Sequence, residues 1–96
     1  ATLNGARALG LQADLGSLVE GKKADLVLVD IDRPSFVPLL DPLGNLVHCG
    51  QGSTVRHVVV DGELRVVDGE AVGIDEAAIL ADAQQASEDL WRRAAR

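Results

Sequence analysis

The sequence predicts a mostly β fold with flanking helices, and three patterns in its 96 residues carry that prediction. Two Val-rich runs, 54–60 and 63–67, are separated by Asp-Gly, which is typical of a β-hairpin. A third run, 26–29, is apolar at four consecutive positions, as in a strand that is covered on both faces. Apolar residues at helical spacing are found near the two ends of the chain.

Residues 1–11 are predicted to form a helix and the turn that closes it. Leu3, Ala6 and Leu9 recur at intervals of three, which places them on one helical face, and Gly10 stands where a left-handed residue ends a helix. No good capping residue precedes the pattern, and the sequence contains no Met. We therefore expect the helix to begin upstream, in a longer polypeptide of which this chain is the end or a trimmed piece.

Residues 12–74 are predicted to be rich in β-structure. In the first part of this segment we expect a short strand over 16–19, a turn over 20–23 and a strand over 24–30. The apolar middle of the last strand has no polar alternation, so both of its faces require cover.

Three prolines between positions 32 and 44 predict an extended loop, because proline cannot donate to a sheet ladder. The segment 43–49 leaves two alternatives open. It forms one or two helical turns, with Asp41 as the cap and Pro42 in the first turn, or it forms a short edge strand.

The two Val-rich runs form the clearest local pattern. Asp61-Gly62 between them predicts a type I′ turn, because Asp and Gly tolerate the positive φ that this turn requires. A second pair, Asp68-Gly69, turns the chain again toward residues 70–73. The result is a β-meander.

Residues 75–96 are predicted to be a C-terminal helix. Asp75 is a suitable cap, and the acidic start and basic end of the segment both suit the helix dipole, with Glu76 at one end and Arg92, Arg93 and Arg96 at the other. The helix should dock onto another element, since its narrow apolar stripe is too rich in Ala to hold it in isolation. The stripe consists of Ile79, Ala83, Ala86 and Leu90.

Charge and composition exclude several classes of function. The net charge is −6 and the acidic residues are spread along the chain, which argues against a nucleic-acid partner and against an anionic membrane. No apolar run approaches the roughly 20 residues that span a bilayer. The single Cys49 excludes an internal disulfide, so a reducing cytoplasm is the expected location.

The residues able to carry chemistry do not form a recognisable site. His48 and Cys49 are adjacent and therefore diverge in either a strand or a helix, and His57 falls in a Val-rich strand where packing or a rim position is expected. Spacings typical of zinc ligands are absent from the sequence. We therefore assign no catalytic, cofactor-binding or metal-ligating residue.

Two other short motifs also receive structural interpretations. Gly50-Gln51-Gly52 resembles the opening of a dinucleotide fingerprint, but it does not continue as one and it precedes a strand. Lys22 and Lys23 form a small basic patch, which we interpret as the solvated tip of a turn.

Three stretches, in order along the chain, are similar to the C-terminal region of the amidohydrolase superfamily. The resemblance is to the branch that contains nucleobase deaminases, adenosine-derivative deaminases and triazine chlorohydrolases. The first stretch, 1–11, resembles the helix after the last barrel strand; the second, 16–30, reads GSLVEGKKADLVLVD and is the most specific. The third runs from Asp41-Pro42-Leu43 to VRHVVVDG at 55–62.

The resemblance implies a metal-dependent parent enzyme with a (β/α)₈ barrel. It places residues 1–11 in the last barrel helix, 12–74 in a β-rich composite domain and 75–96 in a C-terminal helix. The family's metal ligands, a His-x-His pair, two further His and an Asp that hold zinc or iron, lie upstream of the matched region. In such a parent a metal-bound water attacks a ring or amide-like carbon and expels ammonia or another leaving group. This chain alone is then expected to be an inactive scaffold.

The resemblance also implies partners for the apolar faces of this chain. In a parent enzyme they are covered by the N-terminal barrel portion; in the isolated chain we expect dimerisation through the sheet edge or the final helix. The rival interpretation is a free-standing β-rich interaction module. The substrate, and the choice between deamination and dechlorination, depend on barrel loops outside the chain.

Overall fold

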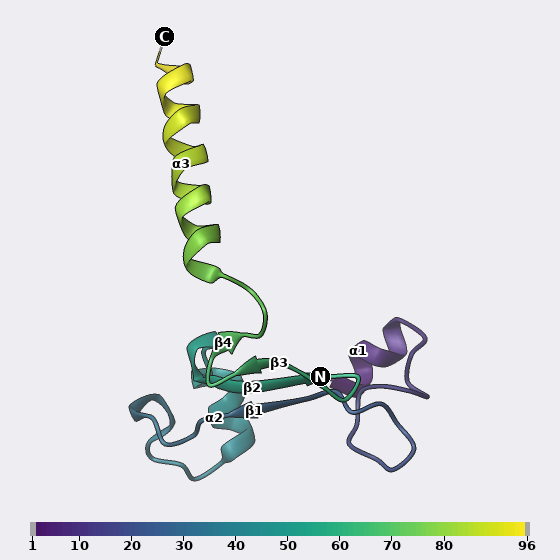
Figure 1. The fold of residues 1–96 in the computed structure, drawn as a ribbon. Coiled ribbons are helices and arrows are strands. Elements are labelled where there is room, and N and C mark those ends of the chain that lie inside the picture. The colour runs from purple at the N-terminus through teal and green to yellow at the C-terminus, as the bar shows by residue number, and fades with distance from the viewer. Residues whose placement is uncertain (1, 96) are drawn as a thin grey trace.

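A computed structural model describes residues 2–95 of the chain (Figure 1). Four antiparallel strands form one sheet in the order β1-β2-β3-β4, so every strand lies beside its neighbour in sequence. Helices stand at both ends of the chain and in the long connection after β1. The elements are α1 (Thr2–Ala8), β1 (Leu26–Val29), the 3₁₀ turn η1 (Pro34–Phe36), α2 (Pro42–Cys49), the 3₁₀ turn η2 (Gly52–Thr54), β2 (Val55–Val60), β3 (Glu63–Val67), β4 (Glu70–Ala71) and α3 (Glu76–Ala94).

The predicted hairpin and meander are confirmed. Asp61 and Gly62 have φ of 51° and 82°, and Asp68 and Gly69 have φ of 50° and 85°, the left-handed values that a type I′ turn requires at both central positions. The first turn joins β2 to β3 and the second joins β3 to β4. The Asp-Gly pairs therefore set the topology of the sheet.

Both ladders of the central strand β2 contain a β-bulge. Between β1 and β2, Leu28 pairs with His57 and Val29 with Val55, so Arg56 is the extra residue. Between β2 and β3 the register shifts between Val58 and Val59. A bulge re-aims the side chain of the extra residue, and Arg56 is the residue affected on β2.

The strand predicted over 16–19 is not present. Gly16 has φ of 92° and passes directly over α1, where a Cβ on this glycine would lie 2.8 Å from the Ala6 Cβ. Two connections hold the loop: the N–H of Lys23 donates to the Asp14 carbonyl at 3.0 Å, and that of Lys22 to the Val19 carbonyl at 3.1 Å. The loop follows α1 instead of joining the sheet, and the predicted turn over 20–23 is confirmed.

The ambiguous segment 43–49 is helical, as α2, with Pro42 in its first turn. Asp41 occupies the N-cap position, but its side chain makes no capping hydrogen bond. The Asn45 side chain instead donates to the carbonyl of Phe36 at 3.1 Å, which ties α2 to the preceding loop. Apart from η1, the proline-rich segment is a loop, as predicted.

The core of the described residues is thin. Phe36 is fully buried, Ala6 and Thr54 are nearly so, and both middle residues of β1 are exposed. The two-sided cover that β1 requires is therefore not supplied within residues 2–95. Large apolar side chains are exposed directly after α1 and on β1, α2 and α3, including Leu9, Val27, Leu43, Ile79 and Trp91.

Helix α3 projects away from the sheet (Figure 1). Asp75 caps it as predicted, accepting a hydrogen bond from the Ala78 N–H at 3.0 Å, and Arg92 and Arg93 lie in its last turn, while Arg96 lies outside the described residues. All described residues of the helix are exposed. Because of this projection the radius of gyration is 18.5 Å, against about 12–13 Å for a compact chain of this length.

We expect Gly16→Ala to destabilise the fold more than Gly21→Ala. Both glycines have similar positive φ, 92° and 88°, so both variants lose about 1 kcal/mol from backbone strain. Only at Gly16 does the new Cβ meet α1, which adds about 1–3 kcal/mol of overpacking. Urea unfolding followed by circular dichroism measures the difference, and equal losses would show that α1 does not pack on Gly16.

Candidate functional site

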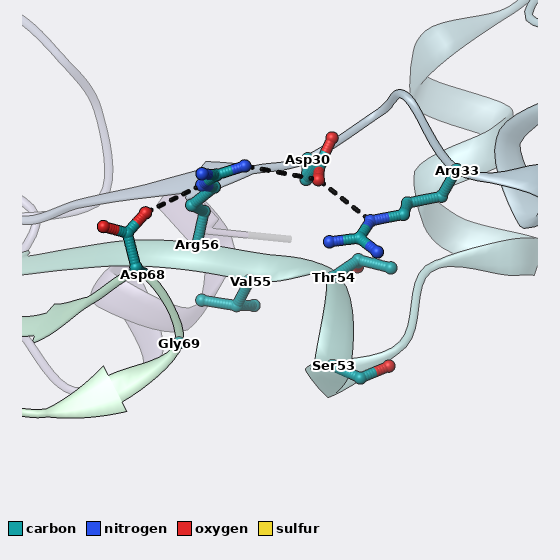
Figure 2. Close-up of a pocket in the computed structure, with 8 residues that line it drawn as sticks. All are labelled: Asp30, Arg33, Ser53, Thr54, Val55, Arg56, Asp68 and Gly69. Atoms are coloured by element: carbon teal, nitrogen blue, oxygen red, sulfur yellow. Dashed lines mark hydrogen bonds and ion pairs between the residues drawn. The ribbon is translucent and has the colours of Figure 1, made fainter.

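A polar groove lies where β1 ends and the β3–β4 turn approaches β2 (Figure 2). It encloses about 200 Å³. We call it the ion-pair groove, after the four charged residues that dominate it. Its lining consists of Asp30, Arg33, Ser53, Thr54, Val55, Arg56, Asp68 and Gly69.

Each charged residue reaches the groove because of its place in the backbone of the sheet and its turns. Asp30 directly follows β1, and its N–H donates to the Thr54 carbonyl at 2.8 Å, which extends the ladder by one residue. Arg56 is the bulge residue of β2, and Asp68 occupies the left-handed turn after β3. Arg33 follows Asp30 by three residues and lies at the start of η1.

The four charges alternate in sign and contact one another in a chain. The Arg33 Nε donates to Asp30 Oδ2 at 2.9 Å, and an Arg56 guanidinium nitrogen lies 3.7 Å from the same oxygen. The Arg56 Nε then donates to Asp68 Oδ1 at 2.9 Å. Figure 2 shows Arg56 between the two carboxylates.

Asp30 is the most enclosed member of the chain of charges, with 17% of its side chain exposed against about half or more for the others. The backbone N–H of Asp32, at 3.1 Å, lowers the pKa of Asp30, and the guanidinium groups of Arg33 and Arg56 lower it further against the opposing effect of partial burial. The carboxylate is therefore held in its charged form.

This arrangement suits a structural connection better than proton transfer. Each carboxylate is already bonded to a guanidinium, and a carboxyl with a lowered pKa is a poor general base near neutral pH. The groove joins β1, β2 and the β3–β4 turn through side chains. What it does chemically is to fix these three segments relative to one another.

The histidines and the cysteine identified in the sequence lie apart. His57 sits beside the groove, where its Nδ1 accepts a hydrogen bond from the Asp68 N–H at 3.3 Å, in agreement with the rim position predicted. His48 and Cys49 are exposed at the end of α2, and Gly50-Gln51-Gly52 leads into η2 and β2. Among these residues, all of which lie in the described part of the chain, His57 alone lies beside another residue that could carry chemistry, namely Asp68.

The two lysines have more defined partners than the solvated tip we predicted. Lys22 Nζ donates to the carbonyls of Gln12 and Leu15, at 2.6 and 3.2 Å, and so closes the loop after α1. Lys23 pairs with Asp61 at 3.1 Å, and this hydrogen bond and charge raise the pKa of Lys23. The patch is thus a pair of tethers, one to the loop and one to the hairpin.

Within residues 2–95, no three His, Cys, Asp or Glu side chains are grouped so that they could hold a metal ion. The described residues therefore do not fit a metal centre. That the chain carries no site residues stays a prediction. In the same described part of the chain, no helix is both long and apolar enough to cross a membrane.

Sequence reasoning missed the ion-pair groove. The spacing of Asp30 and Arg33 was visible, but a regular hairpin around Asp61-Gly62 places Arg56 opposite Val67, not Asp68. The shift in register between β2 and β3 moves the pairing by one residue. The sequence contains one indication of the groove, the opposite charges of Arg56 and Asp68 near the ends of the hairpin strands.

The family of the chain follows from comparison with known proteins. The model of the amidohydrolase family matches residues 1–65, and the chain belongs to this family. The resemblance inferred from the sequence is therefore confirmed.

Similar proteins include deaminases with curated sequences. A 5-methylthioadenosine/S-adenosylhomocysteine deaminase of Moorella thermoacetica is 48% identical over 84% of this chain and 19% of its own length. A 5'-deoxyadenosine deaminase of Methanosarcina mazei is 40% identical over 97% of this chain and 21% of its own length. The chain thus spans about a fifth of the length of these relatives.

Solved structures resemble the chain in the same way. An adenosine deaminase from Xanthomonas campestris with bound zinc superimposes with a TM-score of 0.88 and 37% identity, over 96% of this chain and 21% of that one. Atrazine chlorohydrolase from Arthrobacter aurescens, complexed with zinc, gives a TM-score of 0.77 and 33% identity over 88% of this chain and 18% of its own.

We expect Asp30→Asn to weaken the fold at neutral pH and to reduce its sensitivity to acid. Because the pKa of Asp30 is lower in the folded state, its charge stabilises the fold above the unfolded pKa of about 3.9, and this contribution disappears as the pH falls through the folded value. Urea unfolding across this pH range tests the expectation.

Asp32→Asn is the matched control, since Asp32 contacts Asp30 through its backbone N–H and the substitution leaves that donor in place. We expect the control to unfold in acid as the wild type does. An Asp30→Asn variant with the same acid dependence as the wild type would show that the ion-pair groove does not stabilise the fold.

Proposed function

We propose that this chain is the C-terminal scaffold segment of a metal-dependent amidohydrolase that deaminates a nitrogen heterocycle such as an adenosine derivative. The observation that carries the proposal is the agreement with the zinc-bound adenosine deaminase, at a TM-score of 0.88 over 96% of the chain. Deaminases at 40–48% identity support the same assignment. The chlorohydrolase supports it less, because it is less similar in both sequence and structure.

In this proposal residues 1–11, which include α1, end the last barrel helix. Residues 12–74 are part of a β-rich composite domain, and residues 75–96, which include α3, are the C-terminal helix. The exposed apolar side chains directly after α1 and on β1 support the assignment, since Leu9, Val27 and Leu28 have no cover among the described residues. The N-terminal barrel portion of the parent is the partner that covers them.

The parent's divalent metal, zinc or iron, is held outside this segment. Two zinc-bound structures among the similar proteins support a metal in the parent, and residues 2–95 supply no ligand group for it. The contribution of this chain is then mechanical: its ion pairs hold the sheet in one register and present a fixed surface to the barrel. We propose a cytoplasmic location for the parent, on the grounds of charge and the single cysteine.

The test begins with the natural gene product. We expect several hundred residues, a bound divalent metal, and ammonia release from 5'-deoxyadenosine or 5'-methylthioadenosine; chloride release from a chlorinated triazine is the alternative activity to assay in parallel. The 96-residue chain, purified in the same way, is the matched control and should contain no metal and release no ammonia.

Two outcomes would contradict the proposal. A natural product of only 96 residues would leave the free-standing interaction module as the better interpretation. A metal-containing long product that releases neither ammonia nor chloride would keep the family but exclude both activities.

A further inference from the structure

Helix α3 presents an apolar stripe that no other described element covers. The stripe residues follow a spacing of four, three and four, and Ile79 and Leu90 are 56% and 61% exposed. Leu80 and Trp91, exposed at 63% and 72%, widen it along one flank. A stripe of this kind on an exposed helix is a surface for another helix.

We propose that α3 pairs with α3 of a second copy of this chain, in antiparallel orientation about a two-fold axis midway between Gln84 and Gln85. This proposal concerns association and does not depend on the proposed activity. It selects the final helix over the sheet edge as the contact between copies.

The stripe matches itself when it is reversed about this axis. Ile79 then faces Leu90 of the second copy, and Ala83 faces Ala86. Large residues meet at the two ends and small residues at the centre, where they allow the helix backbones to approach closely. A two-fold interface requires such self-complementarity, since each contact occurs twice.

Charge complementarity chooses the antiparallel orientation. In the same register Glu76, in the first turn, faces Arg93, in the last turn of the second copy. Parallel pairing instead places Glu76 against Glu76 and Arg93 against Arg93. Because of the two-fold axis, the antiparallel form contains the favourable pair twice and the parallel form contains two like-charge contacts.

The flank of the stripe opposite Leu80 and Trp91 is acidic, but it still allows the two helices to pair. Asp82 approaches Asp89 of the second copy along this side, but Asp89 is already paired with Arg92 of its own helix at 2.8 Å. Both carboxylates face solvent, where their repulsion is screened. The opposite flank brings Leu80 and Trp91 of both copies together.

The contact is small, and this sets the expected affinity. A helix of 19 residues is about 28 Å long, so a single helix pair buries less than the roughly 1,000 Å² typical of stable interfaces. We therefore expect a dissociation constant in the micromolar range or weaker, measured by sedimentation equilibrium of the 96-residue chain up to about millimolar concentration.

Two substitutions distinguish the contribution of the stripe to association from that of the opposite face of the helix. Leu90→Lys places a charge opposite Ile79 and should weaken association at least tenfold. Gln85→Lys introduces the same residue on the opposite face and should leave association within about twofold. Circular dichroism of both variants, with unchanged helix content, keeps a loss of association distinct from a loss of the helix.

Orientation is tested by exchange of charge. Glu76→Arg and Arg93→Glu should each weaken association by about threefold to tenfold, whereas the double variant, with the original net charge, should recover it. The helix dipole opposes both changes, so recovery in the double variant cannot come from a more stable helix. No recovery would overturn the antiparallel register.

Distances between spin labels provide an independent measurement. The labels are introduced in a Cys49→Ser background. Measured along the helix, a label at Gln84 is nearly level with the two-fold axis and with its copy, whereas a label at Ala77 lies at least about 22 Å from its copy. The two positions lie on nearly the same face, so a parallel pair would give similar distances at both. Similar distances, a monomer at millimolar concentration, or association unaffected by Leu90→Lys would each overturn the proposal.

Discussion

The fold depends on the backbone ladders of β2, because few side chains of the described residues are buried. β2 pairs with β1 on one side and with β3 on the other, and β4 is attached only through β3. Phe36 is the only large side chain that is fully buried in the described part of the chain. In a small domain with so little buried apolar surface, backbone hydrogen bonds and specific polar contacts carry a greater share of the stability.

The bulge at Arg56 links this ladder to the ion-pair groove. A regular strand alternates its side chains between two faces, whereas the extra residue of a bulge is freed from that alternation. Arg56 therefore reaches both Asp30 at the end of β1 and Asp68 in the turn after β3. A contact that joins three segments limits register slippage, to which a sheet lacking a buried face is prone.

The sequence predicted those elements whose cause is local. Asp61-Gly62 and Asp68-Gly69 tolerate the positive φ of a tight turn, and Asp75 caps the helix that follows it, so the meander and α3 were both predicted. The predicted strand over 16–19 was wrong because Gly16 lies against α1, and this contact comes from the packing of two separate segments rather than from a local preference. The groove was missed for the same reason, since it depends on a register shift that no turn motif specifies.

The apolar surface of this chain falls into two kinds, which differ in what can cover them. The exposed residues of β1 belong to a strand whose sequence has no polar face, so they require a covering layer of different structure. The stripe of α3 is narrow, palindromic in size and opposite in charge at its two ends, features that a sheet or barrel surface does not require of its partner. A helix that is complementary to its own reverse has in a second copy a partner that already matches it, and its projection away from the sheet leaves room for that copy.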